Sequence, residues 1–181
     1  PMRQAQESWK RLVLHSLPPP SWLGPDGPDC DVVISSRARL ARNLAGHRFP
    51  HHASPEELRE IVQEVLAAFA PLDLTVIRRM SPVEREFHVG CRMISADFDV
   101  EKPGRVLLLN AERSLSIMVN EEDHLRLQGL TAGWALRDAL RIAEEAEDAA
   151  PLRYAHAAPW GYLTASPYNA GTARRLSALS T

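Results

Sequence analysis

The most regular hydrophobic pattern in the chain has the period of an α-helix and predicts one from Ser54 to about Phe69. Ser54 can cap this helix, Pro55 fits its first turn, and Glu57 completes a capping box. The apolar residues fall on one stripe: Leu58, Ile61, Val62, Val65, Leu66 and Phe69. A second long helix is predicted from Thr131 to about Ala149, a segment rich in Ala, Leu, Glu and Arg.

Shorter apolar and β-branched runs predict strands. Asp31–Ser35 predicts a strand that leads into an arginine-rich loop, and Arg105–Asn110 with Ser114–Asn120 predicts an antiparallel hairpin. After an acidic turn, the alternation in His124–Gln128 predicts a third strand of the same meander. Weaker strand patterns lie at Leu74–Ile77, Phe87–Ile94 and Gly161–Thr164.

Together these elements predict the α+β class, with an antiparallel sheet flanked by helices. Residues 1–28 include an amphipathic stretch, Trp9–Leu17, and then a dense run of Pro and Gly. Such a segment is typical of an N-terminal arm or linker. We therefore expect one globular domain over residues 29–181.

Composition narrows the possible functions. Of the 181 residues, 45% are hydrophobic and 24% charged, which is enough apolar material for a sizeable core. Lys and Arg number 21 against 23 Asp and Glu, so a general nucleic-acid binder is not expected. No apolar run approaches the roughly 20 residues of a membrane-spanning helix. Cys30 and Cys91 form no disulfide framework, and a cytoplasmic location is the default prediction.

The first group of candidate residues is the arginine-rich segment Ser35–Asn43. On extended chain Arg37 and Arg39 point to the same side, so their guanidinium groups converge. Phosphate is the natural ligand of such a pair, because Arg makes bidentate, charge-assisted bonds to its oxygens. A solvated basic edge is the alternative explanation.

The second group is the acidic turn Asn120–Arg126. Consecutive carboxylates usually mark only a solvated turn, but Glu121 and Glu122 stand between two apolar strand runs. Carboxylates held there could clamp a guanidinium or Mg²⁺, and one could accept a proton. His124 is interpreted as structural. His51 and His52 lack the spacing of a metal pair, so we assign no transition metal.

The third group is the segment Gly161–Arg175. Its Ser-Pro turn is ordinary loop chemistry. Ser166 has no GxSxG frame, which argues against a serine hydrolase.

Taken in order, three stretches resemble the phosphagen (ATP:guanido) kinases, which transfer the ATP γ-phosphoryl group to a guanidino nitrogen. The stretches are Val33–Asn43, Val119–Arg126 and Gly161–Thr172. Gly27–Val33 and Ser114–Gln128 narrow the resemblance to the bacterial protein-arginine kinases. The resemblance implies a catalytic domain like that of glutamine synthetase, with ATP and Mg²⁺ as cofactors.

The resemblance also implies roles for individual residues. Nucleotide phosphates would be bound by Ser35, Arg37, Arg39, Arg126 and Arg175. Glu121 or Glu122 would hold the substrate guanidinium and act as the base. This role has a physical reason, since a guanidinium has a pKa far above neutral and cannot attack phosphorus before it loses a proton.

Several positions depart from the family pattern. Ser166 replaces a reactive Cys, and a neutral hydroxyl cannot supply the negative charge of a thiolate. Ala173 replaces a glycine and adds a Cβ that restricts φ. Arg92 aligns with a histidine that the family places near the nucleotide. The family domain continues beyond the position of Thr181, so we expect a partial catalytic domain whose sheet edge is exposed.

Three functions therefore stay open. The first is a protein-arginine kinase of weakened activity, and the second is an inactive, pseudokinase-like binding module. A kinase for a small guanidino compound is the third. The resemblance further implies protein substrates bound through arginine, a homo-oligomer, a role in stress response, and a zinc-binding activator and a Clp-type unfoldase as partners.

Overall fold

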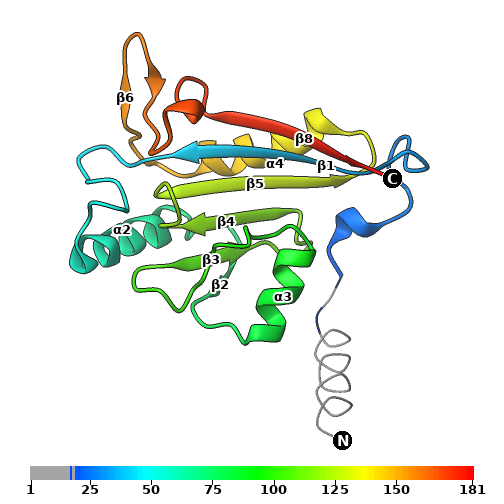
Figure 1. Cartoon of the computed structure of the whole chain (residues 1–181), viewed down its shortest axis with the longest axis horizontal. Helices are drawn as coiled ribbons and strands as arrows, with labels where there is room; N and C mark the ends of the chain where they lie inside the picture. Colours follow the sequence, from blue (N-terminus) through cyan, green and yellow to red (C-terminus); the bar gives the residue numbers. More distant parts are fainter. Residues whose placement is uncertain (1–16, 18) are drawn as a thin grey trace, which may run out of the picture.

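A computed structural model describes residue 17 and residues 19–181 of the chain. Over this part, one six-stranded sheet runs in the order β2-β3-β4-β5-β1-β8, and all its neighbouring strands are antiparallel (Figure 1). The predicted α+β class is confirmed. The predicted amphipathic stretch Trp9–Leu17 lies, apart from its last residue, outside the described residues.

The sheet strands are β1 Val33–Arg42, β2 Thr75–Ile77, β3 Val106–Leu109, β4 Leu115–Val119, β5 Leu125–Ala132 and β8 Arg174–Ser180. The helices are α2 Pro55–Ala68, α3 Pro82–Gly90 and α4 Leu136–Ala149. A separate small hairpin pairs β6 His156–Ala157 with β7 Gly161–Tyr162, and the 3-10 turns are η1 Ser21–Leu23 and η2 Pro167–Asn169. None of the described helices is long and apolar enough to cross a membrane.

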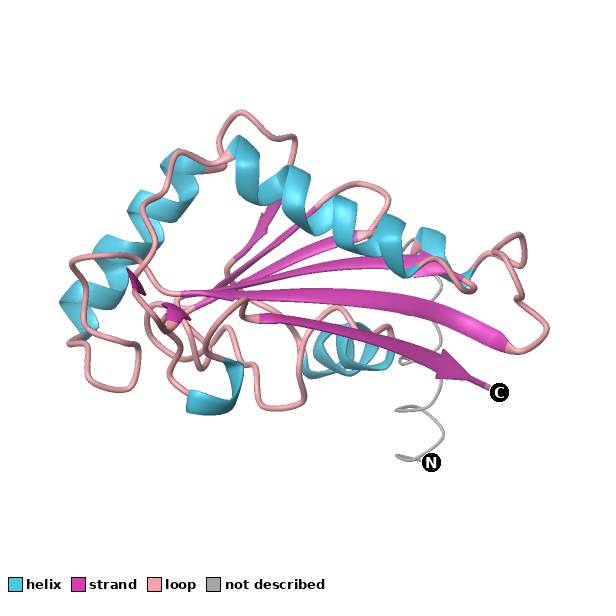
Figure 2. Cartoon of the chain, turned by 90° about the horizontal axis from the view of Figure 1, so that it is seen from above, coloured by secondary structure: helices cyan, strands magenta, loops and turns pink. Residues whose placement is uncertain are grey.

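The two faces of the sheet are covered unequally (Figure 2). Helices α2 and α4 pack on one face against a core that includes Leu40, Ile117 and Leu127. On the other face, side chains of α3 and the loop after it pack near Leu107, Leu109 and Met118 of β3 and β4. These segments lie near β3 and β4, and over β5, β1 and β8 the same face of the sheet presents polar side chains.

Close packing of α4 on β5 depends on small residues. A Cβ added at Gly129 would lie 2.0 Å from the carbonyl oxygen of Ala139, so only glycine fits there. Ala139, Ala143 and Ala146 form the buried side of α4. The helix can therefore approach the sheet backbone directly.

Helix α2 confirms its prediction, with one difference at its start. The Ser54 side chain accepts a hydrogen bond from the Glu57 N–H at 3.2 Å, as a cap should. The Glu57 carboxylate instead accepts from the backbone N–H and the Nε of Arg48, both at 2.8 Å. The reciprocal capping box occurs on α3, between Ser81 and Glu84.

The strand predicted at Phe87–Ile94 is wrong, because α3 occupies Pro82–Gly90. A capping Ser81, Pro82 in the first turn and Glu84 at the third position make a strong local start for a helix. The apolar residues that suggested a strand instead face the second core from the end of this helix and the loop after it.

Three further boundaries differ from the sequence analysis. β1 continues through the expected arginine loop to Arg42, and β5 extends to Ala132, which delays α4 until Leu136. The edge strand β8 was not predicted; its Leu176 and Leu179 are exposed. In the segment predicted as an arm, Trp22 is buried in the core, while a domain boundary at residue 28 stays a prediction.

Candidate active site

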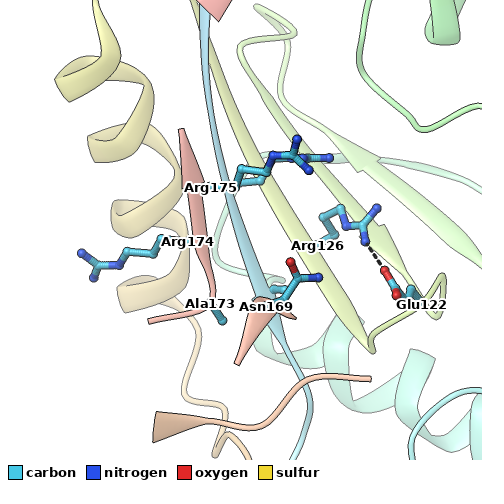
Figure 3. A pocket seen from close by; sticks show the side chains of 8 residues that line it. Glu122, Arg126, Asn169, Ala173, Arg174 and Arg175 are labelled. Atoms are coloured by element: carbon cyan, nitrogen blue, oxygen red, sulfur yellow. Dashed lines mark hydrogen bonds and ion pairs between the residues drawn. The ribbon is translucent and has the colours of Figure 1, made fainter. Parts of the chain in front are cut away.

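Three strands bring guanidinium groups to one face of the sheet. Arg39 pairs across the sheet with Gln128 of β5 on one side and with Arg175 of β8 on the other. Arg37 lies two residues away on the same face, and Arg126 lies opposite Ala41. The expectation that Arg37 and Arg39 share a face is confirmed, and the strand pairing places Arg126 and Arg175 on that face. Arg126 and Arg175 line one cavity (Figure 3).

The arginines perturb one another. Burial, followed by the charges of Arg39, Arg92, Arg175 and Arg126, lowers the pKa of Arg37 to about 10. Burial and neighbouring guanidinium charges also lower the pKa of Arg39, whereas the Glu121 carboxylate opposes that shift. Mutual repulsion of this kind is relieved when a polyvalent anion binds.

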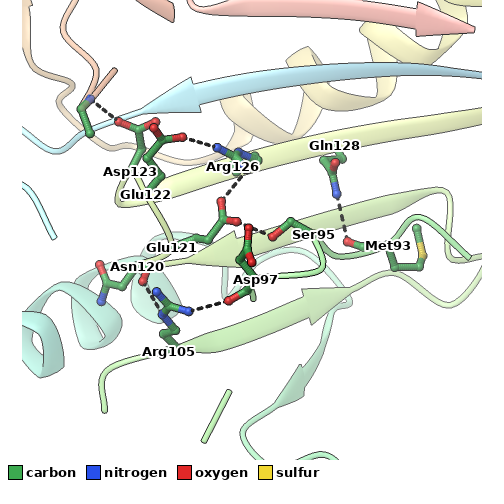
Figure 4. Close-up of polar contacts among 11 residues, drawn as sticks. Met93, Ser95, Asp97, Arg105, Asn120, Glu121, Glu122, Asp123, Arg126 and Gln128 are labelled. Atoms are coloured by element: carbon green, nitrogen blue, oxygen red, sulfur yellow. Dashed lines mark hydrogen bonds and ion pairs between the residues drawn. The ribbon is translucent and has the colours of Figure 1, made fainter. Parts of the chain in front are cut away.

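Arg92 reaches this cluster from the loop after α3. Its Nη1 donates to the Ser35 hydroxyl at 3.3 Å, and its backbone is left-handed, with φ of +57°. The next residue fixes the loop, because the Met93 carbonyl accepts hydrogen bonds from Ser116 and, at 2.9 Å, from Gln128 (Figure 4). Ser35, whose hydroxyl accepts this hydrogen bond from Arg92, is fully buried.

Each carboxylate of the acidic turn has a different environment. The Glu121 side chain is 9% exposed, accepts from the Ser95 hydroxyl and forms an ion pair with Arg126 at 2.5 Å (Figure 4). Glu122 is 46% exposed and pairs with the other terminal nitrogen of Arg126 at 3.0 Å. Arg126 thus joins the acidic turn to the arginine cluster.

Asp123 is buried and serves as an anchor. One of its oxygens accepts from the Asn43 side chain at 2.6 Å and from the Ala165 backbone N–H at 2.7 Å. Asn43 accepts in turn from the backbone N–H of His124 at 3.0 Å. The end of β1, the acidic turn and the segment before Ser166 are therefore held together.

Cavities connect these groups. One of about 230 Å³ lies among Arg39, Glu122, Arg126, Asn169 and Arg175. Glu121 and Glu122 also border a space of about 430 Å³ next to Ser95 and Arg126, and another of about 600 Å³ that extends toward α2. A phosphate chain on the arginines and a cation on the carboxylates could thus meet at Arg126.

The comparisons with known proteins agree with this geometry. A family model described as the ATP:guanido phosphotransferase C-terminal catalytic domain matches residues 56–180. The chain belongs to this family. The resemblance drawn from the sequence motifs is therefore confirmed at the level of the family.

Several relatives are named protein-arginine kinase. Those from Moorella thermoacetica and Desulforamulus reducens are 41% and 39% identical to this chain over 87% and 91% of its length. The aligned regions cover 48% and 49% of those two proteins, so the chain spans about half the length of its relatives.

Solved phosphagen kinases share the fold. The duplicated taurocyamine kinase of Schistosoma mansoni, solved with components of a transition-state analogue, has a TM-score of 0.78 at 25% identity. That match covers 92% of this chain and 25% of the other. A lombricine kinase structure has a TM-score of 0.69 at 24% identity, with 90% of this chain and 52% of the other covered.

Two of the positions at which the resemblance implies a departure from the family pattern are Ser166 and Ala173. Ser166 is half-buried beside Ala165, which lines the same cavity as Glu121 and Glu122. Ala173 is buried next to the arginine cluster with a left-handed φ of +49°. The predicted restriction on φ therefore falls on a residue whose backbone occupies a region that glycine prefers.

Other charged residues of the motifs are structural. Arg42 is buried, forms an ion pair with Glu147 of α4 and lies 3.7 Å from the ring centre of Tyr162. Arg174 points away from the cavity toward α4, where it pairs with Glu144 at 2.6 Å (Figure 3). His124 is buried between the Leu44 N–H and the Arg48 carbonyl, as expected for a structural histidine.

Ser95, Asn169 and the anchoring role of Asp123 were not predicted from the sequence. No local pattern marks Ser95, which meets Glu121 only through the loop after α3. Asn43 and Asp123 did lie within the quoted motifs, and their amide and carboxylate are a natural hydrogen-bonded pair. Their hydrogen bond could be recognised only once the fold brought the two residues together.

Proposed function

We propose that this chain carries the nucleotide and guanidinium sites of a protein-arginine kinase, which transfers the γ-phosphoryl group of ATP to arginine side chains of proteins. The observation that carries the proposal is the Arg126 junction, where a phosphate-binding cluster meets paired carboxylates. The names of the relatives, of which this chain spans about half, support proteins as substrates.

In the proposed reaction, Arg37, Arg39, Arg126 and Arg175 neutralise the triphosphate. Arg92 and the Ser35 hydroxyl complete the cluster. A substrate guanidinium would lie against Glu121 or Glu122, one of which accepts its proton. The freed nitrogen lone pair attacks the γ-phosphorus, and the bond to the β-phosphate oxygen breaks. The arginines hold the departing diphosphate.

Mg²⁺ fits this site as a companion of the nucleotide. Of the residues that line the cavity of about 230 Å³, Glu122 offers a carboxylate and Asn169 an amide oxygen, while arginines cannot coordinate a cation. Mg²⁺ normally keeps several waters and binds one or two carboxylates plus substrate phosphates. When bound, it would neutralise charge between the β- and γ-phosphates.

Arg126 favours an order of binding in the proposed reaction, with the nucleotide before the arginine substrate. The Arg126 guanidinium forms ion pairs with both glutamates, through Nη1 to Glu121 Oε2 at 2.5 Å and through Nη2 to Glu122 Oε2 at 3.0 Å. A bound triphosphate would compete for Arg126 and free carboxylate oxygens for the substrate. Nucleotide should therefore strengthen the binding of arginine peptides.

An inactive binding module is the second candidate, favoured by Ser166 and by the strained Ala173. Incubation with Mg-ATP and casein-like protein or free arginine, followed by detection of acid-labile phosphoarginine, distinguishes the candidates. A kinase should form phosphoarginine, lose the reaction in Glu121→Ala or Glu122→Ala, and gain turnover in Ser166→Cys. Free arginine as the preferred acceptor would instead indicate a small-molecule guanidino kinase.

Nucleotide binding tests the first half of the site independently. Arg37→Ala should weaken ATP binding about tenfold to a hundredfold, because a charge-assisted hydrogen bond is lost. Arg137→Ala, an exposed arginine on α4, is the matched control. Equal affinity in both variants would refute a phosphate role for the cluster, whereas binding without phosphoarginine would favour the inactive module.

The zinc-binding activator, the Clp-type unfoldase and the homo-oligomer stay predictions of the family resemblance. A stress-response role is likewise a prediction of the resemblance, and the cytoplasmic location stays the prediction made from the cysteine content.

A further inference from the structure

Two neighbouring cavities share lining residues, and the inner one borders the two glutamates. The cavity of about 600 Å³ beside Glu121 and Glu122 is also lined by Lys102, Pro103 and Arg105. These same three residues line a further cavity of about 330 Å³ between α2 and the segment after β2. Lys102 and Arg105 therefore border both the carboxylate site and the outer cavity.

The outer cavity has more positive than negative charge. Arg78 and Arg79 line it beside Lys102, and all three side chains are exposed. Among the described residues, none of the three has an ion-pair partner. Glu101 is the acidic residue of the lining, and the remaining Arg59 is already paired with Glu56 at 2.7 Å.

Arg105 lies between the two cavities, and backbone carbonyls fix the position of its guanidinium group. Its Nε donates to the Asn120 carbonyl at 2.9 Å and its Nη1 to the Asp97 carbonyl at 3.3 Å (Figure 4). The basic groove is thus defined by Arg78, Arg79 and Lys102. The triphosphate cluster lies on β1, β5 and β8, so the proposed phosphoryl transfer makes no use of this groove.

Building on the proposed function, we propose that the basic groove binds acidic side chains that flank the target arginine of a substrate protein. An extended peptide whose arginine reaches Glu121 and Glu122 would continue over Lys102 and Pro103, which border both cavities. Pro50, Pro55 and Leu58 give the inner cavity an apolar wall. Neighbouring Asp or Glu residues of the substrate would then complement Arg78, Arg79 and Lys102.

Four labelled peptides test the proposal by fluorescence anisotropy, with the full chain and a non-hydrolysable ATP analogue. The target position is Arg or Gln, and the flanking residues are Glu or Gln. With Arg as the target, Glu flanks should tighten binding about tenfold at low salt, and high salt should shrink the difference.

Charge-reversal variants locate the effect. The double variant Arg78→Glu/Arg79→Glu should abolish the preference for Glu flanks. Arg137→Glu/Arg153→Glu makes the same change in net charge at exposed positions that line neither cavity. This control variant should keep the preference for Glu flanks. Lys102→Gln provides a milder test with the same direction. Equal affinity for Glu and Gln flanks, or equal loss in both double variants, would overturn the proposal.

The same peptides separate this proposal from the proposed function. If Arg and Gln targets bind equally, the guanidinium site fails, yet the flank comparison still decides whether the groove recognises acidic residues. If the target matters and the flanks do not, the groove proposal alone fails.

Discussion

Ala173 occupies a backbone conformation that residues with a Cβ rarely adopt. Its φ is +49°, and its carbonyl accepts a hydrogen bond from the Ala41 N–H at 2.9 Å. Pairing of β8 with β1 therefore holds the strained conformation beside the arginine cluster. The left-handed region costs a non-glycine residue about 1–2 kcal/mol.

Replacing Ala173 with glycine should stabilise the protein. The Ala173→Gly variant removes the strain but adds backbone freedom to the unfolded chain, so the free energy of unfolding should rise by about 0.5–1 kcal/mol. Urea denaturation measures the change. Ala170→Gly, at an exposed alanine with φ of −61°, is the control and should lower stability. A stability loss in Ala173→Gly would contradict this account.

Replacing Asp123 should destabilise the protein much more than replacing Glu122 of the same turn. Asp123→Ala leaves the Asn43 amide and the Ala165 N–H without their acceptor and should cost about 2–3 kcal/mol. Glu122→Ala, at a half-exposed side chain, should change the free energy of unfolding by less than about 0.5 kcal/mol. Thermal or urea unfolding of both variants checks this. Equal losses would mean that Asp123 is no anchor.

At the scale of elements, Gly129 determines how closely α4 approaches the sheet. Gly129→Ala would place a methyl carbon 2.0 Å from a backbone oxygen of α4 and should cost about 3 kcal/mol or more. Gly90→Ala, where a Cβ meets nothing within 4 Å, should leave stability nearly unchanged. Chemical denaturation of the pair is the measurement, and a tolerated Gly129→Ala would refute the close packing.

Elements with strong local signals could be predicted from the sequence. Helix α2 has both a cap and an apolar stripe, and the hairpin of β3 and β4 has two apolar runs. Strand β1 was predicted too short because arginines occupy its polar face, and β8 has few buried residues to mark it. Its strand conformation arises from pairing with β1.

The site was predictable where a local period places residues together. Alternation puts Arg37 and Arg39 on one face, but only the strand register brings Arg175 and Gln128 beside Arg39. Resemblance, rather than spacing, suggested Arg126 and Arg175. The contact of Ser95 with Glu121 and the anchoring by Asp123 depend on loops from distant parts of the chain.

At the scale of the whole molecule, two buried histidines should make folding sensitive to acid. Burial lowers the pKa of both His88 and His124 to about 4. The unfolded chain binds these protons near the ordinary pKa of 6.5, whereas the folded protein does not. Stability should therefore fall as the pH drops from about 6.5 toward 4, by at most about 1.4 kcal/mol per pH unit for each histidine.

Urea midpoints between pH 7 and pH 5 measure this slope. His124→Gln should reduce it even if the variant is less stable at every pH. An unaltered slope in His124→Gln would show that His124 is protonated alike in both states.

Arg39, Gln128 and Arg175 share one cross-strand row, whereas Leu40 and Leu127 share the next, on the opposite face. Sliding β1 by a single residue would push guanidinium groups into hydrocarbon and turn aliphatic groups outward. A chain with the wrong register would thus lose both its hydrophobic core and its anion-binding cluster. Binding of a triphosphate would then report correct strand register, so it can be used to measure the fraction of refolded protein.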